Sequence, residues 1–362
     1  MIRTIRNKRW AVVLAAILLL SCLLTISCDR APRMERFSEY SFDYFDTVTT
    51  VTGYAETKEE FDRIAAQVLA ELGEYHRLFT IYHRYEGMEN LCTVNEVVDG
   101  VHRPVKVDAR IMDMLAYAKD MYEKTDGRMN VAMGSVLSIW HEYREVGMSE
   151  PWNAALPPME ALSEAAEHTD IRNVILDKEN STVFLADPKM RLDVGAVAKG
   201  YAVEMVARSL EEQGIEGFVL NVGGNVRTIG AKADGSPWTA GITNPIESES
   251  EQKPYVAYLD LVGESLVTSG SYQRYYTVDG KNYHHIVDPD TLMPAEGYLS
   301  VSVVGTSSAD GDALSTALFC MTVEEGRALL RSMGNAEALW ILPDGTQIAS
   351  DGFREHISQS KS

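Results

Sequence analysis

The chain has 362 residues, of which 45% are hydrophobic and 24% charged, proportions typical of a folded globular protein rather than a disordered one. This length is sufficient for one large hydrophobic core or two modest ones. The formal net charge of −20 argues against a nucleic acid as partner, because the protein would repel its phosphates.

The first 28 residues have the layout of an export signal. Four basic residues precede the apolar run WAVVLAAILLLSCLLTIS, which ends at Ser27 directly before Cys28. A small residue followed by a cysteine resembles the processing site of bacterial lipoproteins. We therefore expect residues 1–27 to be a signal peptide and Cys28 to carry the lipid, with Cys22 as a weaker second candidate.

An uncleaved membrane anchor is the alternative for this segment. Both alternatives place the body of the protein outside the cytoplasm, on the periplasmic or outer surface, and tether it to the cell membrane. Removing residues 1–27 deletes four basic side chains and no acidic one, so the charge changes from −20 to −24. We expect residues 28–39 to form a polar tether and residues 40–355 a single domain, because no repeat, low-complexity tract or linker divides them.

The rest of the chain alternates irregularly between strand and helix patterns. Apolar residues at helical spacing predict helices, and alternating Val, Thr and Tyr residues predict strands. This irregular order favours an α+β fold, a single body of mixed or antiparallel sheets with packed helices, over a doubly wound parallel sheet. The predicted elements are a strand at 45–55, helices at 58–79, 108–125 and 198–214, hairpins at 173–188 and 275–289, a strand–turn–strand unit at 217–230 and a helix within 308–321.

The stretch SADGDALSTALFCM, residues 308–321, places Asp312 and Thr316 one helical turn apart on the same face. Two interpretations are open. Asp312 is either a helix cap, with Thr316 bonded back to the preceding turn, or the two oxygens are part of a metal site. In the second case Asp310 is the candidate for the cap.

The stretch RLDVGAVAKGYAVEMV, residues 191–206, delivers Asp193 at a strand end and begins a helix near Lys199. A helix N-terminus with a lysine suits phosphate oxygens, although the spacing is not that of a P-loop. The alternative is a tight turn with Lys199 in solvent. The paired glycines of NVGGNVRTIG, residues 221–230, indicate a bulge or a close approach to the backbone.

His284 and His285 are adjacent, so on a strand they face opposite sides and at most one can reach a given site. No histidine pair has metal-binding helical spacing, and Cys92 and Cys320 have no local partner, which argues against zinc. Any metal is therefore predicted to be hard and oxygen-bound, such as Mg²⁺. Cys320 lies in an apolar helical pattern typical of a core residue, and a bridge between Cys92 and Cys320 is left open.

Five ordered motifs together resemble the bacterial FAD:protein FMN transferase family, also called the ApbE family, over about residues 40–350. Three further stretches nearer the N-terminus also resemble the family. FDTVTT resembles its first strand, LFTIYHR the segment after its first helix, and DGRMNVAMGSVLSIW a further family motif. The five motifs are LDVGAVAKGYAVE, NVGGNVRTIG, TSGSYQRYY, HIVDP and DALSTALF.

The resemblance implies a site, residue by residue. It places Mg²⁺ between the Asp312 carboxylate, the Thr316 hydroxyl and the backbone carbonyl of Ala196. It places FAD in a cleft between sub-regions of the domain. The positions implied to contact FAD are Phe45, Tyr82, Met129, Asn130, Asp193, Lys199 and the backbone of Ile286.

The resemblance also implies an activity. FMN would pass from FAD to a threonine or serine hydroxyl in a D-G-A-[ST]-type motif of a partner, with release of AMP. The expected partners are flavin-carrying subunits of membrane redox complexes on the same side of the membrane. His285 is the candidate base, because it titrates near neutrality, with a structural histidine as the alternative. Two other functions stay open: a Mg²⁺-dependent FAD pyrophosphatase, and a non-catalytic FAD-binding lipoprotein.

Overall fold

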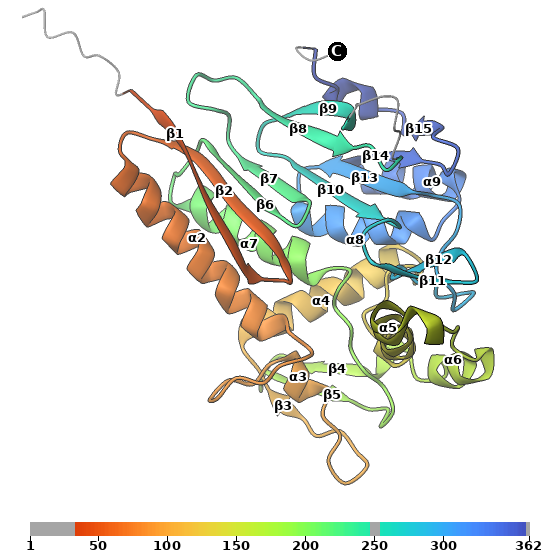
Figure 1. The fold of residues 1–362 in the computed structure, drawn as a ribbon. Helices are drawn as coiled ribbons and strands as arrows, with labels where there is room; N and C mark the ends of the chain where they lie inside the picture. Colours follow the sequence, from red (N-terminus) through yellow and green to blue (C-terminus); the bar gives the residue numbers. More distant parts are fainter. Residues whose placement is uncertain (1–32, 247–253, 360–362) are drawn as a thin grey trace, which may run out of the picture.

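The centre of the protein is an eight-stranded sheet in which every neighbouring pair is antiparallel. The computed structural model describes residues 33–246 and 254–359 (Figure 1). In spatial order the strands are β1 (Glu35–Tyr44), β2 (Thr47–Ala55), β6 (Phe218–Val222), β7 (Asn225–Ile229), β10 (Ser265–Gly270), β13 (Ser300–Gly305), β14 (Ala336–Ile341) and β15 (Gln347–Ala349).

Helices cover one face of this sheet and enclose the main core (Figure 1). Residues Phe61, Ile64, Val68 and Leu72 follow the helical period along α2 (Lys58–Phe79) and are all buried there. Beside α2 lie α7 (Ala198–Glu212) and α8 (Ser308–Phe319), the latter buried over nearly its whole length against β10 and β13. The remaining helices of the main body are α3 (Leu91–Val94), α4 (Ala109–Lys124) and α9 (Val323–Met333).

The opposite face of the sheet is partly covered by a hairpin, β8 (Trp238–Thr243) and β9 (Tyr255–Leu261). Ile242, Leu259 and Leu261 of this hairpin pack with Leu266 and Val304 in a second core. Strand β13 is therefore covered on both faces, which explains why its six residues SVSVVG are all buried.

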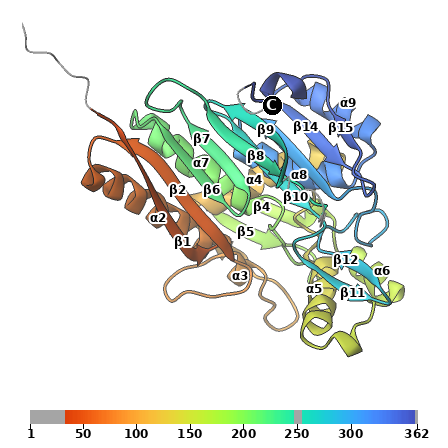
Figure 2. The same ribbon diagram turned by 45° about the horizontal axis from the view of Figure 1, so that its top comes forward.

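Two smaller units flank the sheet. A three-stranded sheet has the order β3 (Val105–Lys106), β5 (Thr182–Leu185), β4 (Val174–Asp177). A small lobe consists of α5 (Gly134–Ser149), α6 (Met159–Ala166), β11 (Tyr275–Val278) and β12 (Lys281–His284) (Figures 1 and 2). The lobe has its own core, which includes Val136, Trp140, Leu162 and Tyr276.

The α+β prediction is confirmed, and the predicted helices and hairpins lie within a few residues of the observed ones. One boundary is wrong. Residues 28–39 were expected to be tether, whereas β1 begins at Glu35 and pairs with β2 along its length. β1 is an edge strand whose first five residues, 35–39, are mostly polar, so no alternation of apolar residues distinguishes this part from a tether.

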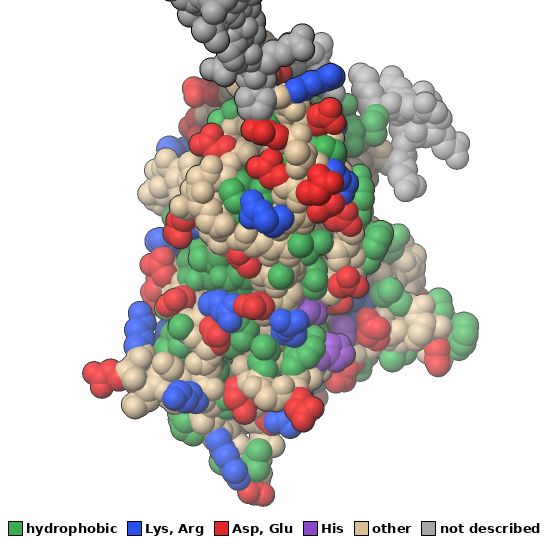
Figure 3. Space-filling view, turned by 90° about the vertical axis from the view of Figure 1, so that its left-hand side faces the viewer, with side chains coloured by type: hydrophobic (Ala, Val, Ile, Leu, Met, Phe, Trp, Pro, Cys, Tyr) green, Lys and Arg blue, Asp and Glu red, His purple; other side chains and the backbone are tan. Residues whose placement is uncertain are grey.

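Two further expectations concern the two cysteines after residue 28 and the N-terminal segment. Cys92 and Cys320 are both free thiols in the described chain, so the disulfide that the sequence left undecided between them is not formed. The signal peptide and Cys28 lie outside the described residues, and among the described helices none has the length and hydrophobicity needed to cross a bilayer. On the face formed by β1 and α2, acidic and basic side chains are interspersed (Figure 3).

Candidate functional site

A cleft of about 480 Å³ opens where the small lobe meets the main body. The β1–β2 turn, the start of α7, the β6–β7 turn, the end of β10 and one face of α8 supply the wall on the main-body side. Helix α5 and the segment after β12 supply the other wall. The predicted residues that line the cleft are Phe45, Tyr82, Asn130, Asp193, Ala196, Lys199, His285, Ile286, Asp312 and Thr316.

A larger groove of about 1050 Å³ runs beside β9, β15 and the segment Phe353–His356. It contains none of the predicted site residues. We therefore place the candidate site in the smaller cleft, which has the size of ordinary small-ligand pockets, roughly 300–1,000 Å³.

The chemical centre of the cleft is the contact between α7 and α8. Lys199 donates from Nζ to Asp312 Oδ1 at 3.1 Å and also to the Asn225 side-chain oxygen. The backbone N–H of Gly200 donates to Asp312 Oδ2 at 2.7 Å. The Lys199 side chain is only 23% exposed, so the alternative of a solvated lysine is wrong.

The choice between a helix cap and a cleft residue is resolved for Asp312. The cap of α8 is Ser307, whose hydroxyl accepts the N–H of Asp310 at 3.2 Å, so neither Asp310 nor Asp312 caps this helix. Asp312 instead caps the first turn of the neighbouring helix α7 through Gly200. Thr316 does bond back to the Asp312 carbonyl, at 3.3 Å, while also lining the cleft.

The donor set at this point suits a hard cation. Asp312 provides a buried carboxylate, Thr316 a hydroxyl and Ala196 a backbone carbonyl, and all three residues line the same cleft. Mg²⁺ is usually held by one or two carboxylates, with water and substrate phosphates completing the shell. No cluster of three or more His, Cys, Asp or Glu residues with metal-binding geometry occurs in residues 33–246 and 254–359. The residues fit Mg²⁺ on the condition that substrate and water supply the remaining ligands.

The two adjacent histidines have different surroundings, as the strand geometry predicted. His284 Nε2 donates to the Ala295 carbonyl at 2.8 Å while its Nδ1 accepts the Ile286 N–H at 3.2 Å, so this ring is a neutral structural element. His285 faces the cleft, and its Nδ1 has no partner among the described residues. Burial, followed by the charge of Arg274, lowers the pKa of His285 to about 3, so the expectation that this histidine titrates near neutrality is wrong for the protein without ligand.

The lowered pKa of His285 predicts an acid-sensitive fold. Below pH 6.5 the unfolded chain binds a proton at this histidine and the folded chain does not, so stability is lost as pH falls from 6.5 towards 3. We expect the wild type to lose about 2 kcal/mol more than His285→Gln between about pH 7.5 and pH 5, measured by urea unfolding. Exposed His83→Gln is the control, and equal losses in all three proteins would contradict the prediction.

The β1–β2 turn places a strained aromatic residue at the cleft. Phe45 and Asp46 have φ values of 55° and 51°, in the left-handed region that non-glycine residues seldom adopt. His76 on α2 holds this turn, because its Nδ1 accepts the Phe45 N–H at 3.1 Å and its ring meets the Phe45 ring edge-on at 5.5 Å. The turn is thus fixed from outside the cleft.

Asp193, Tyr82 and Asn130, the other predicted FAD contacts with side chains in the cleft, differ in exposure and in hydrogen bonding. Asp193 closes a tight turn by accepting the Gly195 N–H at 2.9 Å, and burial raises the pKa of its carboxyl. Tyr82 is 56% exposed, with its ring 5.7 Å from that of His141. Asn130 reaches the cleft, but its amide also bonds to Thr169 and Ala132.

The predicted contact between Met129 and FAD is corrected by the structure. The Met129 side chain is fully buried in the main core and does not line the cleft, because the preceding segment turns the residue inward, with its N–H bonded to Thr125 at 3.1 Å. A direct contact between this side chain and a ligand is therefore excluded in this conformation.

The sequence analysis missed basic residues in the cleft. Arg144 on α5 lies 2.7 Å from His141 through Nη2, and burial lowers the pKa of its guanidinium. Arg274 lines the cleft from the loop before β11. Arg274 lies inside the TSGSYQRYY motif and could have been identified there, whereas no pattern around Arg144 indicates that α5 faces this cleft.

Comparison with known proteins gives consistent matches. The model of the ApbE family matches residues 45–340. An FAD:protein FMN transferase of Klebsiella pneumoniae is 35% identical, over 78% of this chain and 86% of the relative. One of Treponema pallidum is 31% identical over 91% of each chain. The crystal structure of the ApbE protein of Thermotoga maritima superposes with a TM-score of 0.76 at 27% identity, covering 90% of this chain and all of that one.

Proposed function

The chain belongs to the ApbE family of flavin transferases, and we propose that it uses Mg²⁺ to move FMN from FAD onto a threonine or serine hydroxyl of a partner protein, releasing AMP. The chain is thus an enzyme with FAD as its substrate. One observation carries the finer proposal: a buried carboxylate, a lysine, a helix N-terminus and a neutral histidine from three separate motifs meet in one cleft.

FAD and the body of the protein are both negatively charged, so binding requires local positive charge. The FAD diphosphate carries two negative charges, and the body of the protein is strongly acidic. The cleft offsets this repulsion locally with Lys199, Arg144, Arg274 and the N-terminal end of α7. Phe45 and Tyr82 provide aromatic surface at the end of the cleft formed by the β1–β2 turn.

Asp312, Thr316 and the Ala196 carbonyl would hold Mg²⁺ beside the diphosphate. When bound, the ion supplies positive charge that neutralises the phosphoryl oxygens during transfer. Lys199 and the Gly200 N–H hold the Asp312 carboxylate in one position, so it is oriented before the substrate arrives.

In the transfer step the acceptor hydroxyl oxygen forms a bond to the phosphorus on the FMN side of the diphosphate. The bond from that phosphorus to the bridging oxygen breaks, and AMP departs with the bridging oxygen. His285 accepts the hydroxyl proton, since its ring is neutral and its Nδ1 has no partner within the described chain. The negative diphosphate, once bound, would favour the protonated ring and so raise the pKa of His285, against the burial and the Arg274 charge that lower it.

The test is a transfer reaction with the protein lacking residues 1–27. It is incubated with FAD, Mg²⁺ and an acceptor that carries the threonine motif, and the acceptor is examined in a gel for flavin fluorescence. We expect a fluorescent acceptor, and none when its threonine is changed to alanine. Free FMN with a dark acceptor would indicate the pyrophosphatase instead, and unchanged FAD the carrier.

The location of the enzyme is a separate proposal. A lipid on Cys28 would hold the domain at the outer surface of the cell membrane, where flavin-carrying subunits of membrane redox complexes are the partners. The support is the basic and apolar run before Cys28, together with the short segment that separates it from β1.

Lipid attachment has a direct test. We expect Cys28→Ala to abolish labelling of the protein with a fatty-acid analogue and to change its processing, because the modified sulfur is lost. Cys22→Ala is the matched control and should label normally. Labelling that persists in Cys28→Ala would contradict the assignment of this cysteine.

A further inference from the structure

Helices α7 and α8 each supply a carboxylate that accepts an N–H group at the N-terminal end of the other helix. Glu204 of α7 accepts the N–H of Ser308, the first residue of α8, at 2.9 Å. Asp312 of α8 accepts the N–H of Gly200 in the first turn of α7 at 2.7 Å. The first N–H groups of a helix have no partner within it, and negative charge is favoured there. Each helix thus caps the other.

The two helices are in direct contact at Gly200, with no space for a larger side chain at this position. A Cβ atom at Gly200 would lie 2.4 Å from the Ser308 carbonyl oxygen and 2.4 Å from the Asp312 Cβ. The first turn of α8 therefore touches the backbone of α7 directly. Since Asp312 lies one turn further along the same helix, a shift of Ser308 would move the Asp312 carboxylate as well.

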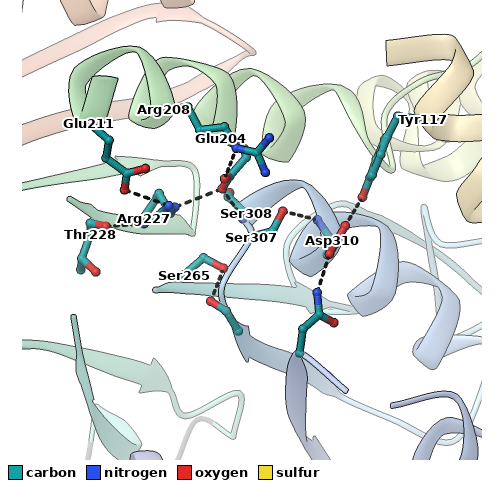
Figure 4. A network of polar contacts seen from close by, with 12 residues as sticks. Tyr117, Glu204, Arg208, Glu211, Arg227, Thr228, Ser265, Ser307, Ser308 and Asp310 are labelled. Atoms are coloured by element: carbon teal, nitrogen blue, oxygen red, sulfur yellow. Dashed lines mark hydrogen bonds and ion pairs between the residues drawn. The ribbon is translucent and has the colours of Figure 1, made fainter. Parts of the chain in front are cut away.

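Glu204 is itself held firmly. It is 1% exposed and accepts Arg227 Nε at 3.0 Å and Arg208 Nε at 2.9 Å (Figure 4). Arg227 is only 4% exposed and bonds in addition to Glu211 and to the Thr228 carbonyl on β7. The start of α8 is therefore tied through Glu204 to the central sheet.

Glu204 does not line the cleft, and nothing in the proposed reaction uses it. We infer that Glu204 is a positioning residue of the flavin site: by anchoring Ser308 it sets where α8 presents Asp312 and Thr316 to Mg²⁺. This inference rests on the proposed function, because it concerns the affinity of the same metal site.

The test measures Mg²⁺ binding directly, by titration calorimetry with magnesium chloride of the protein lacking residues 1–27, saturated with FAD and without an acceptor, because the substrate supplies part of the metal's ligands. A glutamine at position 204 has one acceptor oxygen for the three N–H groups that Glu204 accepts, and its NH2 group must face one of the arginine N–H groups, so it holds Ser308 less firmly than the carboxylate does. We expect Glu204→Gln to weaken Mg²⁺ binding by about tenfold, the effect typical of residues that orient a metal ligand. At saturating Mg²⁺ the kcat for flavin transfer should return to within about twofold of the wild type. Glu211→Gln is the matched control, since it loses a carboxylate from the same arginine without touching α8, and its Mg²⁺ affinity should be unchanged.

A second variant breaks the anchoring contact from the other side: the proline Cδ would occupy the place of the Ser308 amide hydrogen, so the Glu204 carboxylate, 2.9 Å from that nitrogen, must move away. Ser308→Pro deletes the N–H that Glu204 accepts, and proline is well tolerated at the first position of a helix. The preceding residue, Ser307, already has the extended backbone that proline requires, with φ −134° and ψ 125°. Its Mg²⁺ affinity should fall as in Glu204→Gln.

The outcomes separate this inference from the proposed function. Wild-type affinity in folded Ser308→Pro, or equal affinities in Glu204→Gln and Glu211→Gln, would overturn the positioning role and leave the proposed function standing. A wild type that takes up no Mg²⁺ even when saturated with FAD would overturn the metal assignment and this inference together.

Discussion

Asp312→Asn is expected to fold normally and to lose flavin transfer by at least about a hundredfold at low millimolar Mg²⁺. The asparagine oxygen can still accept the Gly200 N–H, so the cap on α7 survives. What disappears is the negative charge that a hard divalent cation requires. Transfer rates across a Mg²⁺ titration, with circular dichroism to verify the fold, would measure both parts of the expectation.

Two variants on the same helix sharpen this result. Thr316→Val keeps the shape of the side chain and removes a neutral ligand, so higher Mg²⁺ should rescue it better than Asp312→Asn. Asp310→Asn makes the identical chemical change two residues earlier, where the carboxylate bonds to Tyr117 and Asn335 away from the cleft. Its Mg²⁺ requirement should stay within about twofold of the wild type. Full transfer by Asp312→Asn at every Mg²⁺ concentration would exclude the metal assignment.

Gly200→Ala is expected to lower the free energy of unfolding by about 3 kcal/mol and to abolish most flavin transfer. The added methyl group would have to lie 2.4 Å from a backbone oxygen of α8, so the two helices must separate. Separation moves Asp312 away from Lys199 and breaks both N-terminal caps. Urea unfolding and the transfer assay measure the two effects independently.

The matched control is another glycine in a helix. Gly73 of α2 is buried, and a Cβ there would lie 3.0 Å from a ring carbon of Tyr44, a side chain that can shift. Alanine also favours the helix by about 1 kcal/mol over glycine, so Gly73→Ala should change stability little. A Gly200→Ala protein as stable as Gly73→Ala would show that α7 and α8 are not in close contact at this point.

The sequence predicted local structure well where chemistry and spacing are both local. The amphipathic period of α2, the hairpin within residues 275–289 and the opposite facing of His284 and His285 all follow from residue order, and the structure agrees. The cap on α8 was also within reach, because Ser307 is followed three residues later by Asp310, a pattern resembling a capping box.

Contacts between segments that are far apart in the sequence could not be predicted from residue order. Nothing near Gly200 indicates that α8 lies against it, and nothing near Glu204 indicates that it caps Ser308, more than a hundred residues away. The inward orientation of Met129 and the exposure of Arg144 to the cleft likewise depend on how the small lobe packs. The resemblance to a family supplied the cleft residues as a set, while their partners required the structure.

The most direct test of the account is the ratio of AMP released to flavin attached in one reaction with FAD, Mg²⁺ and the acceptor. The account predicts one AMP for each flavin, and an acceptor whose mass has increased by FMN less one water. AMP and free FMN in equal amounts, with the mass of the acceptor unchanged, would contradict it.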